Sequence, residues 1–430
     1  MSVLEVFALG LTVNFEAAPE PSSMATAPLT PTVVAAISKQ QPAPAFASSP
    51  EFQLLLACCG QSSKGERAER VREILHQPLD WERLVQLATH HRVLPHLYRA
   101  LPVSTGAPAS ALQMVQQGYE ANARQTLWLT RELLRILGHL ESCGINALPY
   151  KVPVLAEILY GNVALRQFSD LDVLIHAADV AKAKAAVLEL GYKTTLELTP
   201  REERAYLNSG YEYAFDSSHG QNLLEMQWQI LPRFYSVGFD VDEFFDRATR
   251  VSLGGHSVRA LCAEDLMLVL CVHAAKHAWM QLSWLCDVSE LAQSVDWTVV
   301  RERAQRLGVQ RIVAVTFVLA HRLFGTALPH PVLAQVQKDP AVEELANRIL
   351  PIITQETEYD TDSMGYFRLM VDLRERWQDR LSFLWRLALT PSVGEWSAIR
   401  LPGPLFPLYR IVRLARLAAR LVSSKRQTGP

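Results

Sequence analysis

The middle of this chain has the pattern of β-strands, and the sequence on both sides of it has the pattern of helices. The apolar runs that predict strands are Ile145–Tyr150, Ser169–His176, Tyr211–Phe215 and Asn222–Trp228. Helices are expected between them at Val152–Tyr160 and Asp179–Leu190, each closed by a glycine. Because strands and helices mix within one short segment, we expect an α+β fold, with a small mixed sheet embedded between N- and C-terminal helical regions.

The composition divides the 430-residue chain into four parts. Residues 1–50 hold seven prolines among Ala, Ser and Thr, and we expect them to be disordered because they offer too little apolar surface to offset the entropy of ordering. An alternative start at Met24 is at least as plausible as one at Met1. Residues 51–144 are expected to form an N-terminal helical region, 145–262 the mixed core, and 263–430 a C-terminal helical domain with a basic tail helix.

The helical regions are predicted from their periodicity. Between Ser110 and Ser142, apolar residues recur at spacings of three and four, and Asp80 can cap a helix that starts at Trp81. The C-terminal helices are expected at Leu266–Lys276, Leu282–Ala292, Val299–Leu307, Arg311–Leu323 and Val342–Leu350, with turns near Pro329 and Pro351.

Charge and cysteine usage exclude several classes of protein. Lys and Arg number 42 and Asp and Glu 44, so the net charge of −2 gives no basic field to attract nucleic acid. The six cysteines form no C-x-x-C pair and lie mostly in apolar helical contexts, so we expect reduced, buried thiols in a cytoplasmic protein. The longest apolar run of the C-terminal half, Leu266–Val272, is far shorter than the ~20 residues that span a bilayer.

Two aspartates lie at the start of one predicted strand, in the segment Arg166-Gln-Phe-Ser-Asp170-Leu-Asp172-Val-Leu-Ile175. Because side chains alternate along a strand, Asp170 and Asp172 project from the same face. Neighbouring carboxylates repel each other unless a cation lies between them, and oxygen ligands of this kind suit Mg²⁺. The motif therefore favours one or two metal ions in phosphoryl or nucleotidyl transfer, against the alternative of a solvated strand end.

A third acidic residue, Glu225, lies in the apolar strand Asn222–Trp228. A glutamate in such a strand must be paired, metal-bound or at an edge, because burying it without a partner is expensive. If this strand neighbours the one that carries Asp170, the three carboxylates converge. Glu212 competes for the third position, and the sequence leaves the choice open.

These residues resemble a family, the bacterial uncharacterised nucleotidyltransferases, which is placed in the DNA polymerase beta-like nucleotidyltransferase superfamily. The resemblance covers roughly residues 51–420. It is carried by Lys151-Val-Pro-Val-Leu-Ala-Glu-Ile-Leu-Tyr-Gly161, Ser169-Asp-Leu-Asp172, Glu225-Met-Gln-Trp228, Leu270-Cys-Val-His273-Ala-Ala-Lys276-His277, Trp284-Leu-Cys-Asp287-Val, Thr390-Pro391 and Leu401-Pro402.

The resemblance implies a nucleotidyltransferase core and a metal-dependent transfer of a nucleoside monophosphate from a nucleoside triphosphate to an acceptor hydroxyl, with release of pyrophosphate. Asp170 and Asp172 would bind two Mg²⁺ ions, and Glu225 would be the third carboxylate, which helps to activate the acceptor. The residues expected to contact the nucleotide are Lys151, Arg166, Ser169 and Lys276. The acceptor is a small molecule, a peptide or a protein, and nucleic acid is not expected.

Two positions depart from the family's pattern. The family usually has glycine after the lysine, where the loop would pass close to phosphates, but this chain has Val152. The family's strand tends to carry a histidine where this chain has Gln227. The alternative is therefore a catalytically inactive protein that keeps the fold as a binding or regulatory module. Kinase-like phosphoryl transfer is a third interpretation.

Several basic residues have two interpretations. Lys276 either neutralises the triphosphate or pairs with Asp287 between two helices, and the i, i+4 pair His273 and His277 has a spacing that can bind zinc. The basic stretch 400–426 predicts an amphipathic helix that either packs on its own domain or makes peripheral contact with anionic lipid.

Overall fold

The computed structural model describes most of the chain from residue 49 onward, namely 49–60, 64–101, 106–151, 153–218, 220–354, 359–361, 363–390, 406 and 408–413. These residues belong to one compact unit, Ala47–Pro430. The segment 1–50, for which we expect disorder, lies outside the described residues except for its last two. The predicted boundaries between the parts of the chain stay predictions.

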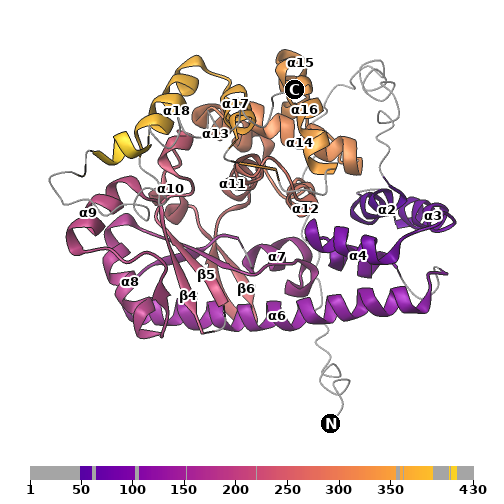
Figure 1. The fold of residues 1–430 in the computed structure, drawn as a ribbon, viewed down its shortest axis with the longest axis horizontal. Helices are drawn as coiled ribbons and strands as arrows, with labels where there is room; N and C mark the ends of the chain where they lie inside the picture. Colours follow the sequence, from indigo (N-terminus) through magenta and orange to yellow (C-terminus); the bar gives the residue numbers. More distant parts are fainter. Residues whose placement is uncertain are drawn as a thin grey trace, which may run out of the picture. The chain divides into compact units, whose positions relative to one another are not determined.

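The N-terminal helices are α2 (Pro50–Cys59), α3 (Lys64–Leu75), α4 (Trp81–His90), α5 (Leu94–Ala100) and the long α6 (Ala109–Ser142). The Asp80 side chain accepts a hydrogen bond from the backbone N–H of Arg83 at 3.1 Å, so it caps α4 as predicted. α6 buries the apolar face that the periodicity predicts, including Leu129, Leu133 and Ile136. Figure 1 shows α6 extending along one side of the unit, below the sheet.

The central sheet has five strands, β1 (Ala147–Pro149), β2 (Leu171–Ile175), β3 (Lys193–Thr194), β4 (Glu212–Ser217) and β5 (Gly220–Gln227). Their spatial order is β1-β2-β5-β4-β3. β2 and β5 are parallel, and the other neighbours are antiparallel. This is the small mixed sheet predicted from the sequence, and it confirms the α+β class.

The strand register determines which side chains share a face. Asp172 of β2 pairs with Glu225 of β5, and Gln227 of β5 pairs with Glu212 of β4. Because directly paired residues project from the same side of a sheet, these four side chains lie on one face across three neighbouring strands.

The elements that connect the strands are α7 (Val154–Tyr160), η3 (Val163–Leu165), η4 (Ala177–Asp179), α8 (Val180–Glu189), α9 (Pro200–Ser209), η5 (Arg233–Tyr235) and α10 (Val241–Asp246). A separate hairpin follows, made of β6 (Thr249–Leu253) and β7 (His256–Ala260). Gly254 and Gly255 have φ of 56° and 81°, the backbone that such a tight turn requires. Neither this hairpin nor α9 is among the elements expected from the sequence.

The C-terminal helices are α11 (Ala263–Lys276), α12 (Leu282–Leu291), α13 (Trp297–Leu307), α14 (Gln310–Phe324), α15 (His330–Lys338), α16 (Ala341–Thr354), α17 (Met364–Asp372) and α18 (Trp377–Leu389). Pro329 precedes α15 as expected, but Pro351 lies inside α16, which ends three residues later, so the turn predicted near Pro351 is wrong. None of the described helices combines the length and the apolar character needed to cross a membrane. Of the tail helix, only 409–413 is described as helical.

The six cysteines are all free thiols, as predicted, but they are not all buried. Cys58, Cys59, Cys271 and Cys286 are buried in the helical layers, whereas Cys143 and Cys262 are half-buried. The expectation of buried thiols is therefore wrong at two positions, where Cys143 caps the end of α6 and Cys262 caps the start of α11.

The buried face of α6 provides a test of the fold. Leu133 is fully buried, whereas Leu127 on the same helix is 61% exposed. We expect Leu133→Ala to lower the free energy of unfolding by about 2–5 kcal/mol, because it removes buried methyl groups and leaves a cavity. Leu127→Ala is the matched control and should change it by no more than about 0.5 kcal/mol. Urea unfolding measures both values, and equal losses would contradict the assigned helix face.

Candidate active site

Three acidic side chains lie on one face of the central sheet. Asp172 of β2 is 1% exposed and lies beside Glu225 of β5, and Glu212 of β4 lies beside Gln227. Both candidates for the third carboxylate, Glu225 and Glu212, are thus close to the same point, since Gln227 hydrogen-bonds to each of them. The sequence leaves the choice between these two residues open, and the fold brings both of them together.

The amide of Gln227 connects these carboxylates. Its Nε2 donates to Glu225 Oε2 at 2.9 Å and to Glu212 Oε2 at 3.1 Å, and it lies 3.5 Å from Asp172 Oδ1. Its Oε1 accepts a hydrogen bond from the hydroxyl of Tyr150. Gln227 is 2% exposed, so it is buried within the site and does not point into solvent. The sequence indicates that Gln227 lies beside Glu225, because residues two apart in a strand project from the same face.

Lys151 is the cation in direct contact with this cluster of acidic side chains. It follows β1 in sequence, and its Nζ donates to Asp172 Oδ1 at 2.6 Å. Burial alone would lower the pKa of Lys151, but the negative charge of Asp172, followed by Tyr150, Glu225 and Asp170, outweighs it and raises the pKa. The lysine therefore remains charged beside the Asp172 carboxyl group.

The remaining negative charge of the cluster is incompletely compensated. Burial raises the pKa of Asp172 to about 7, and Asp170 and Glu225 act in the same direction while Lys151 opposes them. Burial also raises the pKa of Glu225 and of Glu212. A group of carboxyls whose pKa values all rise is a group that a further cation would stabilise.

Asp170 lies directly before β2, on the same side of the strand as Asp172, and is half-buried. Its charge acts on Lys151, Arg92 and Arg166 as well as on Asp172. Ser169 is exposed in the same segment. The two aspartates thus differ in environment, one fully buried in the strand and one at its more accessible end.

Two further cations face the cluster from the helical regions. Lys276 in the last turn of α11 has a pKa that burial lowers, while the charges of Glu212 and Glu225 oppose that shift, and its Nζ lies 5.5 Å from the centre of the Tyr211 ring. Arg92, which belongs to no motif in the sequence, lies between α4 and α5 with φ of 55°. Burial lowers its pKa, whereas Asp170 opposes the shift, so the guanidinium senses that carboxylate.

The guanidinium of Arg92 makes no hydrogen bond or ion pair within the part of the chain that the structure describes, whereas that of Arg166 is bound to Asp287. A half-buried guanidinium held in a left-handed backbone conformation is a ready donor for an anionic ligand. No sequence motif predicts this role of Arg92, because the fold brings in its neighbours from distant parts of the chain.

Arg166, which we expected to contact the nucleotide, is engaged elsewhere. It is buried, and its Nε and Nη2 lie 2.9 and 2.8 Å from Asp287 Oδ2, while the hydroxyl of Tyr160 donates to Asp287 Oδ1 at 2.9 Å. Asp287 thus fixes α12 to the segment that leads into β2. Among the described residues Lys276 makes no ion pair with Asp287, so the alternative pairing is wrong, and that carboxylate binds Arg166 and Tyr160 instead.

His273 and His277 pack as aromatic rings against Trp284. The ring centres of the two histidines lie 4.8 Å apart, and that of His277 lies 5.3 Å from Trp284. Burial lowers the pKa of His277 to about 3, so this ring is neutral at pH 7. Among the described residues, no third ligand gathers around them to complete a zinc site.

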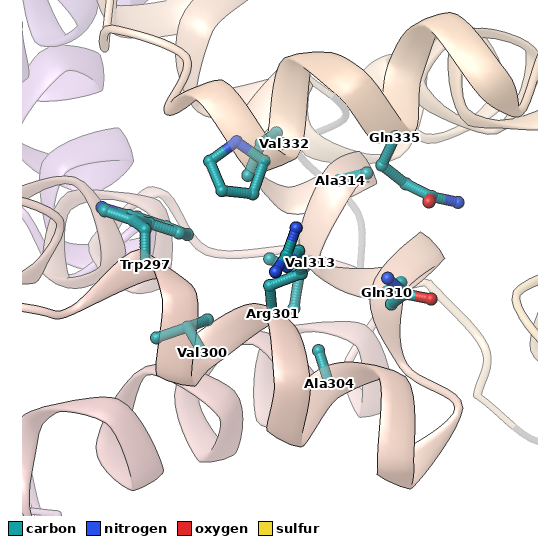
Figure 2. Close-up of a pocket in the computed structure, with 10 residues that line it drawn as sticks. Trp297, Val300, Arg301, Ala304, Gln310, Val313, Ala314, Val332 and Gln335 are labelled. Carbon is teal, nitrogen blue, oxygen red and sulfur yellow. The ribbon is translucent and has the colours of Figure 1, made fainter. Parts of the chain in front are cut away.

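A small cavity lies among α13, α14 and α15, lined by Trp297, Val300, Ala304, Val313, Ala314 and Val332 together with the stems of polar residues (Figure 2). None of the acidic residues or cations described above lines it. Its mainly apolar wall makes it a packing gap between helices, separate from the acidic face of the sheet.

Comparison with known proteins gives one finding. The family model described as uncharacterised nucleotidyltransferase matches residues 77–325, which is more than half of the chain. This range contains α4 to α14 and hence every residue of the acidic cluster and of its surrounding cations. No curated protein and no solved structure gives a significant match.

The Arg166–Asp287 pair provides a prediction about positioning. We expect Asp287→Ala to lower the free energy of unfolding by about 3–5 kcal/mol, because it leaves a buried guanidinium without its partner. The double variant Arg166→Met/Asp287→Leu should recover most of that loss. Arg306→Ala, which removes a pair with Glu243 at the surface, is the control and should cost no more than about 1 kcal/mol. Chemical unfolding measures all three; a small effect of Asp287→Ala would contradict the role.

The raised pKa of Asp172 predicts that the free energy of unfolding of the metal-free protein depends on pH. The folded chain keeps the Asp172 proton up to about pH 7, whereas the unfolded chain releases it near the ordinary value of 3.8. Between these values the folded state binds more protons, so its free energy of unfolding falls as the pH rises from about 4 to 7. Asp172→Asn should remove that fall, and Glu141→Gln, at an exposed position of α6, should keep it. Urea unfolding in chelator at stepped pH tests this; equal slopes for all three proteins would show that Asp172 is ionised throughout.

Proposed function

The chain belongs to the uncharacterised nucleotidyltransferase family, and on that premise we propose that it transfers a nucleoside monophosphate from a nucleoside triphosphate to an acceptor hydroxyl. The proposal includes metal dependence, with Asp170, Asp172 and Glu225 as the ligands. The acceptor is a small molecule, a peptide or a protein.

The observation that carries the proposal is the acidic face of the sheet. Asp172 and Glu225 are paired across parallel strands, and Glu212 joins them through Gln227. Burial raises the pKa values of all three carboxyls even though Lys151 is in direct contact with one of them. If these carboxyls had only a structural role, the cluster would lower the stability of the fold, since buried carboxyls without enough counter-charge are destabilising.

The donor set fits Mg²⁺. Carboxylate oxygens are hard ligands, and Asp170 lies at the more accessible end of the strand, where a ligand can share the coordination with water and phosphate. When bound, two such ions would neutralise the phosphates and make the α-phosphorus more electrophilic. The cluster is acid-rich and a triphosphate adds several more negative charges, so divalent cations are what makes their association favourable.

The surrounding cations would bind the rest of the triphosphate. Lys276 and Arg92 reach the cluster from different helical regions, and each is coupled electrostatically to the carboxylates. Lys151 would balance Asp172, and Ser169 would offer a hydroxyl at the exposed edge. Arg166 would act indirectly, by holding the segment before β2 through Asp287. This division of roles places the positive charge opposite the metal ligands.

In the proposed reaction the acceptor oxygen attacks the α-phosphorus in line. A new bond forms between that oxygen and phosphorus, and the bond from phosphorus to the oxygen bridging to the β-phosphate breaks, so pyrophosphate leaves. The hydroxyl proton passes to Glu225, because burial raises the pKa of this carboxyl and makes it a stronger base than an ordinary glutamate. Glu212 would keep Glu225 basic through their mutual repulsion and their shared contact with Gln227.

A second candidate function is a binding or regulatory module that keeps the fold without catalysis. The observation that favours it is the 2.6 Å contact of Lys151 with Asp172, because a lysine can supply within the chain the charge that a metal would supply. Val152, one of the two departures from the family's pattern, lies outside the described residues. Kinase-like transfer would differ in its product, a nucleoside diphosphate in place of pyrophosphate.

Binding of Mg²⁺ and nucleotide tests the proposal without knowledge of the acceptor. We expect wild-type protein to bind each nucleoside triphosphate in calorimetric titrations only when Mg²⁺ is present. Asp170→Asn, Asp172→Asn and Glu225→Gln should each weaken that binding by about 10-fold or more, because each removes a metal ligand. Glu141→Gln should bind as wild type does.

The same titrations separate the candidate functions. Binding that does not depend on Mg²⁺ and survives Asp172→Asn would favour the non-catalytic module and remove the aspartates from the proposed role. Incubation with a pool of acceptors then distinguishes the reactions, since pyrophosphate release indicates nucleotidyl transfer and diphosphate formation indicates a kinase. Release of pyrophosphate that persists in Asp172→Asn would overturn the assigned site.

A further inference from the structure

A second group of potential metal ligands lies apart from the acidic face of the sheet. It consists of His139 in the last turn of α6, Cys143 directly after that helix, and Glu189 at the end of α8. One ligand atom of each residue lies within 4.8 Å of the ligand atoms of the other two. We propose that these three residues form a binding site for a divalent transition-metal ion of the zinc class.

The local geometry brings the three donors together. His139 and Cys143 are four residues apart at the end of a helix, which places their side chains one above the other on the same side. Glu189 approaches from α8, which packs against α6 (Figure 1), and its Oε2 lies 3.2 Å from His139 Nε2. With bond lengths of about 2.0–2.3 Å, two ligands on a tetrahedral ion are about 3.4 Å apart, so small side-chain rotations are sufficient.

The two helix ends at this point favour a cation, and the ammonium group of Lys182, close to Gly144, opposes it. α6, with 34 residues, and α8 both end here, and the C-terminal end of a helix carries partial negative charge from its last carbonyl groups. Gly144 and Gly191, with φ of 66° and 88°, end the two helices, so the chain turns away and leaves the side chains accessible. The side chain of His139 is 26% exposed and that of Glu189 is 68% exposed, which leaves room for a water as a fourth ligand.

The donor set determines the class of ion. An imidazole, a thiolate and one carboxylate suit Zn²⁺ and related ions, whereas Mg²⁺ prefers oxygen ligands alone. The ion would join α6 to α8, which follows β2 along the chain, and would therefore act as a structural clamp beside the sheet. This proposal is independent of the proposed reaction, because the two sites share no residue and differ in the chemistry of their ligands.

Cobalt binding to the full-length, chelator-treated protein tests the site, because a cysteine thiolate bound to Co²⁺ produces a charge-transfer absorption. We expect one equivalent of Co²⁺ to produce this band and Zn²⁺ to abolish it, with Mg²⁺ having no effect. His139→Ala, Cys143→Ser and Glu189→Gln should each weaken binding by about 10-fold or more.

Two control variants keep this test specific. Cys262→Ser removes the other half-buried thiol, and Asp172→Asn disables the proposed magnesium site; both should bind Co²⁺ as wild type does. Glu189→Gln changes an exposed side chain and should remain folded, as circular dichroism can verify. Absence of the band, or a band that persists in Cys143→Ser, would overturn the proposal and leave only the contact between His139 and Glu189.

Discussion

The ion pair between Lys151 and Asp172 is the contact on which the arrangement of this molecule depends. It connects the end of β1 to β2 at a position where the strand would otherwise bury a bare carboxylate. Because β2 pairs with β5 in parallel, the same contact also fixes the surroundings of Glu225. The amide of Gln227 then extends the network to Glu212, so that one lysine and one amide hold three acids on a single face. This small number of compensating groups explains why burial can raise the pKa values of all three carboxyls at once.

The helical regions complete this face rather than merely covering it. Lys276 arrives from α11, and Arg92 from the turn between α4 and α5, so cations from both sides of the core in sequence converge on the same acids. Their positions require the helices to be fixed relative to the sheet. The buried contacts of Asp287 with Arg166 and Tyr160 provide that connection, and they explain why an arginine next to the aspartates in sequence is not available to a ligand. A buried pair of this kind costs desolvation, and its benefit is the fixed geometry.

The sequence predicts what depends on local spacing and misses what depends on long-range packing. Alternation along a strand was sufficient to place Asp170 and Asp172 on one face, and Asp80 was identifiable as a helix cap. The pairing of Asp172 with Glu225 joins residues 53 positions apart and needed the sheet order, which no local pattern contains. The partner of Arg166 is 121 residues away, so its engagement could not be predicted either. Arg92 carries no motif. The turn expected near Pro351 is wrong, because this proline lies within the last turn of α16.

The contact between Lys151 and Asp172, which favours an inactive protein, is also compatible with an active one. Around the cluster, the carboxylates of Asp170, Asp172, Glu212 and Glu225 outnumber the cations Lys151, Lys276 and Arg92, because Arg166 is neutralised by Asp287. A lysine that fully replaced the metal should leave the cluster balanced, with carboxyl pKa values near their ordinary range. Instead burial and mutual repulsion raise those pKa values despite Lys151. Burial and the surplus of acidic side chains over cations are therefore the physical reasons to propose divalent cations at this site.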